Sequence, residues 1–199
     1  MPKVSDEHLE RRREQILDAA QRCFARKGFH DTSMQDIFSE AELSAGAVYR
    51  YFTSKNAIIA ELVRRTMLPL RAKLATIITE DPLPSPGEVV AMVTREIVKL
   101  SANDGPLCLA PQAWALAMVQ PDANIPVREG ITAMREVWRD YGVRLRDAGR
   151  LPADADVDAF AKTILGVLPG FILQHLIVGD IEPDDFARGI AVLFPDKRD

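Results

Sequence analysis

Apolar residues recur along most of the chain at spacings of three and four, which is the period of amphipathic α-helices. This pattern predicts two short helices within residues 32–50 and longer ones over about 9–27, 55–80, 86–101, 107–119, 127–148 and 156–178, with a last short helix from 183. No stretch alternates convincingly with the period of a strand. We therefore expect an all-α fold, with a three-helix head at residues 1–54 and a six-helix body at 55–199. Pro69 should kink or break its helix, because proline lacks the amide that a helix interior needs.

The two short helices are joined by a tight turn. Thr32 is expected to cap the first, with Gln35 closing a capping box, and Ser44 is expected to cap the second. Glu42 and Leu43 form the turn, and a left-handed Glu42 would cost about 1 kcal/mol. This order predicts a helix-turn-helix, whose second helix can lie in the major groove of DNA.

Residues around this motif extend it into a longer signature that resembles the TetR family of transcriptional regulators. The matching positions are Gly28-Phe29, Thr32, Asp36-Ile37, Ala41, Ser44, Gly46, Tyr49, Tyr51-Phe52 and Ser54-Lys55. The chain departs from the family pattern at Glu42, where glycine is common, and at Asn56, where glutamate is usual. The resemblance covers roughly residues 10–60. It implies a dimeric DNA-binding protein, most commonly a repressor that a small molecule releases from a palindromic operator.

Residues pointing away from the core of this motif are the candidates for DNA contact. Small side chains at Ala45 and Gly46 permit close approach to bases, and Arg50 is the only charged residue of its helix. Lys55, in the first turn of the next helix, is a candidate for phosphate binding. The tyrosines could instead simply pack. The predicted DNA-binding set is Thr32, Ser33, Ser44, Ala45, Gly46, Tyr49, Arg50, Tyr51 and Lys55.

Charge is unevenly distributed along the 199 residues, which carry a net charge of −4. Residues 1–55 contain nine lysines and arginines and nine acidic residues, so the acidic excess lies in the rest of the chain. An acidic body disfavours indiscriminate nucleic-acid binding, which depends on phosphate attraction, but allows a small specific footprint. Arg11, Arg12 and Arg13 are either a solvated helix start or an arm that contacts phosphate or the minor groove.

Aromatic and methionine side chains of the body are candidates for lining an effector cavity. The predicted ligand-binding set is Trp114, Met118, Met134, Trp138, Tyr141, Phe171, Gln174 and His175. The alternative is that these residues are ordinary core and that His175 is a core histidine with its hydrogen bonds satisfied. Few acidic residues lie on these faces, which favours an apolar neutral or anionic effector over a cation.

The predicted helix over 156–178 is apolar nearly all round, so it must be covered on every side. We expect this eighth helix and the ninth, from 183, to form a homodimer surface, as the resemblance also implies. Two recognition helices would then meet double-stranded DNA at a palindromic operator. The alternative function is a helical ligand-binding or adaptor dimer that no longer binds DNA.

The sequence gives no support for an enzyme. His8, His30 and His175 lie far apart, and no residues have metal-ligand spacing or the arrangement of a nucleophile and its base. We therefore expect no catalytic residues, metal or cofactor. The chain has no uninterrupted apolar run of about 18 residues and its start is too charged for a signal peptide, so we expect a cytoplasmic protein without a membrane span. Cys23 and Cys108 fit buried thiols better than a redox pair.

Overall fold

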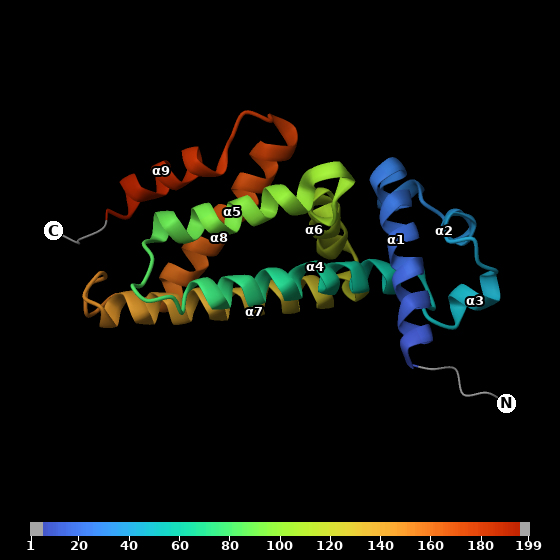
Figure 1. Cartoon of the computed structure of the whole chain (residues 1–199), viewed down its shortest axis with the longest axis horizontal. Helices are drawn as coiled ribbons and strands as arrows, with labels where there is room; N and C mark the ends of the chain where they lie inside the picture. Colours follow the sequence, from blue (N-terminus) through green and yellow to red (C-terminus); the bar gives the residue numbers. More distant parts are fainter. Residues whose placement is uncertain (1–5, 196–199) are drawn as a thin grey trace. The chain divides into compact units, whose positions relative to one another are not determined.

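The computed structural model describes residues 6–195, and all the regular elements in this range are helices, as predicted (Figure 1). The α-helices are α1 (Asp6–Asp31), α2 (Met34–Glu40), α3 (Ala45–Tyr49), α4 (Lys55–Ile77), α5 (Pro86–Ser101), α6 (Ala110–Val119), α7 (Pro121–Asp147), α8 (Val157–Ile177) and α9 (Pro183–Leu193). Two short 3-10 helices, η1 (Ala102–Asp104) and η2 (Pro106–Leu109), connect α5 to α6.

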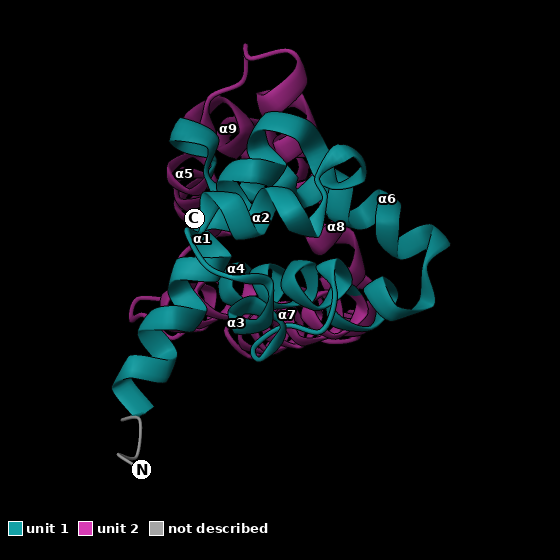
Figure 2. Cartoon of the chain, turned by 90° about the vertical axis from the view of Figure 1, so that its right-hand side faces the viewer, with its two compact units in different colours: residues 1–66, 101–127 teal, residues 67–100, 128–199 magenta. Residues whose placement is uncertain are grey.

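The chain forms two compact units, coloured separately in Figure 2. Unit 1 contains residues up to 66 together with 101–127, and unit 2 contains 67–100 together with the residues from 128 onward. Helices α4 and α7 therefore contribute to both units. The division after residue 54 stays a prediction, and the structure adds that α6 belongs to the same compact unit as the helix-turn-helix.

Unit 1 is built around a core to which α1, α2, α3 and α4 all contribute. Its fully buried members include Ile16, Phe24, Ile37, Val48 and Ile58. Leu109 and Ala113, which are distant in sequence, complete this cluster from η2 and α6. Burying each large apolar side chain contributes about 1.5–3 kcal/mol, so this core fixes the helix-turn-helix against α1.

The end of α1 is shaped by a glycine. Gly28 has a φ of 77°, which interrupts the helical geometry, and Phe29 turns back so that its ring meets Phe24 edge-on at 4.8 Å. The side chain of Gln112 in α6 also lies here, and its Oε1 accepts a 2.8 Å hydrogen bond from the Phe29 amide. A Cβ at Gly28 would lie 3.1 Å from the same oxygen, so the turn and α6 fit closely together.

Unit 2 has its core on the predicted face of α7. Met134, Trp138, Tyr141 and Leu145 follow one another at spacings of four and three and are all buried. The Tyr141 hydroxyl donates a 2.7 Å hydrogen bond to the carbonyl of Pro84, just before α5. The α5 capping box formed by Ser85 and Glu88 is present as predicted.

Two predictions about helix boundaries are wrong. Helix α4 runs through Pro69 without a break and ends at Ile77. Pro69 is exposed, so water can hydrate the carbonyl that loses its helical partner. Helix α7 begins at Pro121, before the apolar pattern that starts at Val127, because proline suits a first helical position.

Helix α8 is long and apolar enough, by length and composition, to cross a membrane, although it contains no uninterrupted apolar run of that length. A core helix can meet the same criteria. Phe160, Ile164, Leu168 and Phe171 of this helix are buried in unit 2, but only 28% of its apolar 18-residue window is buried.

Candidate nucleic-acid interface

The first helix of the motif begins one residue later than predicted. The N-cap of α2 is Ser33, whose Oγ accepts the Asp36 amide at 3.1 Å while the Asp36 carboxylate accepts the Ser33 amide at 2.8 Å. The predicted cap, Thr32, is instead buried, with only 1% of its surface exposed, and its hydroxyl donates to the Gly28 carbonyl at 2.7 Å. Asp36 outcompetes Gln35 because an ionised carboxylate makes a stronger capping bond than an amide.

With Ser33 as the cap of α2, the set of outward-facing side chains differs from the predicted one. Ser33 is exposed, but both its capping bonds and its 2.7 Å hydroxyl bond to Asp36 hold it in place. Gln35 is exposed and makes no hydrogen bond within the described chain, so it is a candidate for DNA contact that sequence reasoning missed. Gln35 becomes a candidate only once Asp36, and not Gln35, is known to close the capping box with Ser33.

The turn between the helices has the predicted geometry. Glu42 adopts a left-handed conformation with a φ of 54°, and the Leu43 amide donates to the Phe38 carbonyl at 3.1 Å. Leu43 packs against the core of unit 1. The strain at Glu42 is therefore offset by a hydrogen-bonded turn with an apolar anchor.

Helix α3 is short, and its orientation depends on a cap and one buried residue. Ser44 caps it by accepting the Ala47 amide at 3.3 Å, as predicted, and Val48 is completely buried. Ser44, Ala45, Gly46, Tyr49 and Arg50 are all exposed. These predicted DNA-binding residues therefore lie on the exposed side of α3, while Val48 on the opposite side packs into the core of unit 1.

Packing within the protein does not explain why residue 46 is a glycine. A Cβ added there would meet nothing within 4 Å, and its backbone is in the ordinary helical region. Glycine in a helix interior costs roughly 0.5–1 kcal/mol relative to alanine. A close approach by another molecule would explain the residue.

We expect Gly46→Ala to separate folding from binding. The free energy of unfolding should rise by about 0.5–1 kcal/mol, because alanine is the better helix former, while DNA affinity falls because a methyl group occupies the approach. Thermal denaturation followed by circular dichroism and DNA titration by fluorescence anisotropy measure the two effects. Ser39→Ala, an exposed change in α2, is the control and should leave DNA affinity unchanged. Unaltered affinity of Gly46→Ala would show that nothing approaches this position closely.

The two tyrosines have different surroundings. Tyr49 is 48% exposed and its ring meets Phe38 edge-on at 5.4 Å, so one side is anchored and the hydroxyl end can reach outward. Tyr51 is partly buried and packs against the core of unit 1. Of the two, Tyr49 has the better access to DNA.

Lys55 is engaged within the protein. Its ammonium donates to the carbonyls of Phe29 at 2.5 Å, Thr32 at 2.7 Å and His30 at 3.2 Å. A cation at the end of a helix is stabilised by the carbonyls there and by the helix dipole. Phosphate binding by Lys55 stays a prediction, and the structure gives this residue a second role, which is to tie the start of α4 to the end of α1.

Most cations near the motif are paired with carboxylates. Glu40 of α2 binds Arg22 at 2.7 Å and Arg26 at 2.5 Å, and Asp36 binds Lys27 at 2.7 Å. Arg50 is exposed, and its side chain has no ion pair or hydrogen bond to any residue in 6–195. Its charge is therefore available for a partner outside the chain.

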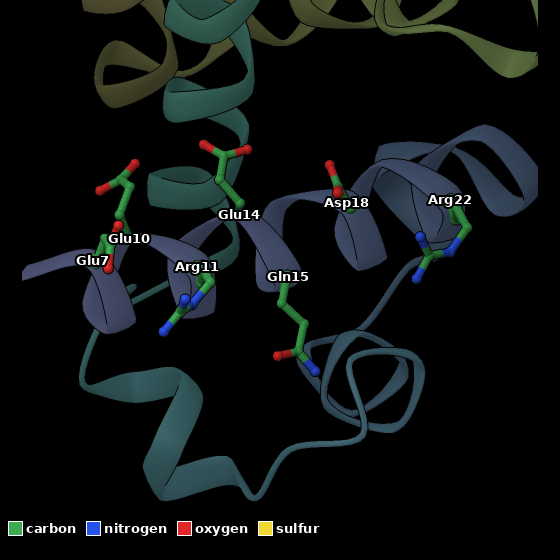
Figure 3. Close-up of a pocket in the computed structure, with 7 residues that line it drawn as sticks. All are labelled: Glu7, Glu10, Arg11, Glu14, Gln15, Asp18 and Arg22. Atoms are coloured by element: carbon green, nitrogen blue, oxygen red, sulfur yellow. The ribbon is translucent and has the colours of Figure 1, made fainter. Parts of the chain in front are cut away.

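The arginine run at the start of α1 does not form one uniform basic arm. Arg13 pairs with Glu61 at 2.8 Å and lies 5.0 Å from the centre of the Phe52 ring, and Arg12 donates to Gln15 at 2.8 Å. Arg11 lines an open groove along α1, shown in Figure 3. The groove residues are Glu7, Glu10, Arg11, Glu14, Gln15, Asp18 and Arg22. With four carboxylates against two guanidinium groups, this groove repels phosphate.

The ion pairs between α1 and α2 should make the head sensitive to acid. Hydrogen bonds from Arg22 and then Arg26 lower the pKa of Glu40, and those from Lys27 and Ser33 lower the pKa of Asp36. A lowered pKa in the folded state gives stability that is present above the ordinary carboxyl range near pH 4 and is lost as the pH falls below it. We expect the melting temperature to drop below about pH 4, and to drop less in the Asp36→Asn, Glu40→Gln double variant. Parallel pH profiles of the two proteins would contradict this.

The predicted ligand-binding residues are divided between the units. Trp114 and Met118 belong to unit 1, where Met118 is 79% exposed, and the other six belong to unit 2. Met134, Trp138, Tyr141 and Phe171 are buried, whereas Gln174 is exposed. His175 stacks on Phe171 with ring centres 5.7 Å apart. That these residues line one cavity stays a prediction.

Comparison with known proteins identifies the motif. The family described as bacterial regulatory proteins, tetR family, matches residues 16–62, which span the core of α1, the whole helix-turn-helix and the first turns of α4. The chain belongs to the TetR family. The resemblance seen in the sequence is thereby confirmed.

Two relatives and one solved structure show how far the likeness of this TetR-family chain extends. An HTH-type transcriptional repressor of Mycobacterium tuberculosis is 35% identical over 109 residues, covering 52% of this chain and 58% of the relative. The HTH-type transcriptional repressor AcnR of Corynebacterium diphtheriae is 25% identical over 193 residues, covering 92% and 90%. FadR from Bacillus subtilis, solved in complex with stearoyl-CoA, has a TM-score of 0.75 at 17% identity, covering 91% of this chain and 96% of FadR. The last of these shows a shared fold.

Proposed function

We propose that this protein is a sequence-specific DNA-binding transcriptional regulator of the bacterial cytoplasm, acting as a repressor. The observation that carries the proposal is the outer side of α3, where Arg50 has no partner in the described chain and Gly46 leaves open space. An unpaired guanidinium beside small residues suits guanine or phosphate at close range. The repressors among the relatives support the direction of control.

The protein acts as a homodimer, since one reading head buries too little surface to bind tightly. Helix α8 exposes Leu173 and Ile177, and Gly166 and Gly170 precede them at helical spacing with open space beside each. Helix α9 exposes Val192 and Leu193. Glycines let helices of a second copy approach closely, while the apolar side chains supply buried area. The two α3 helices would then meet half-sites about 34–36 Å apart, or a multiple of that spacing, in a palindromic operator.

A small apolar effector bound in the helical body releases the repressor. FadR from Bacillus subtilis, which shares this fold, was solved in complex with stearoyl-CoA, a molecule with a long acyl chain, and this supports the proposal. Release requires the effector to prefer the arrangement that does not bind DNA. Helix α6 offers a route to the head, since Gln112 holds the Phe29 amide and Gln120 accepts from Asn56 of α4 at 3.0 Å.

Selection on random double-stranded DNA, followed by sequencing of what the purified protein retains, tests this function. A single enriched palindrome supports a dimeric sequence-specific regulator. The selection is repeated on refolded, ligand-free protein, so that a bound releasing molecule cannot hide the activity. Absence of enrichment from the refolded protein would favour the alternative of an adaptor dimer that no longer binds DNA.

A further inference from the structure

Trp138 carries a polar group that the fold does not satisfy. The side chain is completely buried in the core of unit 2, and its Nε1–H has no hydrogen-bond acceptor among the described residues. The neighbouring Tyr141 ring meets it edge-on at 6.0 Å, and the hydroxyl of that tyrosine bonds to Pro84. Tyr141 thus shows how a polar aromatic residue is normally accommodated in a core.

Burying the indole N–H without a hydrogen-bond acceptor costs free energy, and a phenylalanine at this position would not incur that cost. Burying an N–H without an acceptor forfeits the hydrogen bond that it made with water in the unfolded chain. Phenylalanine would supply an aromatic ring at this position without that loss. The donor at Trp138 is thus better explained by a partner that is not part of the chain.

The surroundings restrict what that partner can be. No charged side chain of unit 2 is fully buried among residues 67–100 and 128–195, and the buried Thr94 hydroxyl already donates to the Val90 carbonyl at 2.7 Å. Arg144 and Arg150 of unit 2 donate to the backbone carbonyls of Ile78 and Leu83. A cation beside Trp138 would therefore find no buried carboxylate, and an anion would have to compete for Arg150, whose Nη2 is buried but whose guanidinium already bonds backbone carbonyls; both charges are disfavoured.

We propose that Trp138 Nε1–H is the anchoring donor for the effector, which is a neutral, mainly apolar molecule with one carbonyl or ether oxygen placed to accept this bond. This inference rests on the proposed function for the effector's role, and it narrows the effector from apolar molecules in general to neutral acceptors. Hydrocarbons fit the apolar surroundings but leave the donor unsatisfied. Carboxylates satisfy the donor but bring an unpaired charge into the core.

A pair of probes tests the anchor directly. Acetophenone and ethylbenzene have similar shapes, but only acetophenone has an acceptor oxygen. The chain has two tryptophans, so the indole ¹⁵N–¹H resonance of Trp138 in the wild-type protein is the one that Trp138→Phe removes. We expect acetophenone to move the indole proton downfield and ethylbenzene not to do so. Thermal stabilisation by acetophenone should correspond to binding about tenfold tighter than ethylbenzene, and this preference should vanish when Trp138→Phe is added.

Three results would overturn the proposal. The first is an indole proton that is already downfield and unmoved by either probe, which would mean that water holds the donor. The second is a preference for acetophenone that survives Trp138→Phe, and the third is no binding of acetophenone. The random-DNA selection is scored separately on the wild-type protein. Acetophenone binding without DNA enrichment would contradict the proposed function while leaving the indole anchor intact.

Discussion

Arg50→Ala should abolish specific DNA binding at physiological salt while leaving the fold unchanged. The side chain is exposed and makes no hydrogen bond or ion pair within the described chain, so its loss removes no polar interaction there. An arginine that reads a guanine contributes about 1–3 kcal/mol, and a dimer carries two such contacts. We therefore expect a loss of about 2–6 kcal/mol, or roughly 30-fold to 10⁴-fold in dissociation constant, measured by fluorescence anisotropy on the selected operator.

Arg71→Ala is the matched control for charge. Arg71 lies in the part of α4 that belongs to unit 2, is exposed and has no partner among residues 6–195. It should bind the operator like the wild type, apart from a small effect of net charge. Equal affinities of the Arg50→Ala and Arg71→Ala proteins would exclude Arg50 as a reading residue. A loss in Arg50→Ala that is uniform over all sequences would instead assign Arg50 to a phosphate.

Ile177→Arg should convert the protein to a monomer and reduce operator affinity at least 100-fold. Ile177 is 76% exposed at the end of α8, on the surface proposed to meet a second copy. An arginine there would have to be desolvated without a partner, and a monomer brings only one recognition helix to the operator. Sedimentation velocity measures the oligomeric state, and anisotropy measures the affinity.

Val119→Arg provides the control for this change, because Val119 is also 76% exposed but lies at the end of α6 in unit 1. It should remain a dimer. A wild-type protein that sediments as a monomer, or an Ile177→Arg variant that stays dimeric, would remove α8 as the interface. Both variants change an apolar side chain that is 76% exposed, so neither should lower the melting temperature of the monomer appreciably.

Interactions between residues close in sequence allowed the helix-turn-helix to be predicted. The Ser44 cap and the turn at Glu42 and Leu43 depend on residues a few positions apart, and both were predicted correctly. The cap of α2 was misplaced because Thr32 and Ser33 are both good caps. The choice depended on Asp36, whose charge makes the stronger reciprocal bond.

Contacts between residues distant in sequence could not be predicted in this way. Nothing in the apolar period of α6 indicates that Gln112 reaches the turn at Gly28, or that this helix belongs with the head. Lys55 illustrates the same difficulty. Its position at the start of a helix predicts a phosphate site, but its ammonium lies among three carbonyls at the end of another helix. Such choices depend on which groups the tertiary structure brings within reach.

The exposed side of α3 affects how operator recognition can diverge among regulators of this kind. Ala45, Gly46 and Arg50 are exposed, and no packing or hydrogen bond within the described chain fixes the identity of their side chains. Substitutions there are therefore nearly neutral for folding, while the buried Val48 and the Ser44 cap keep the helix in place. Gene duplicates can thus acquire new operators through a few changes at these positions without first losing a stable head.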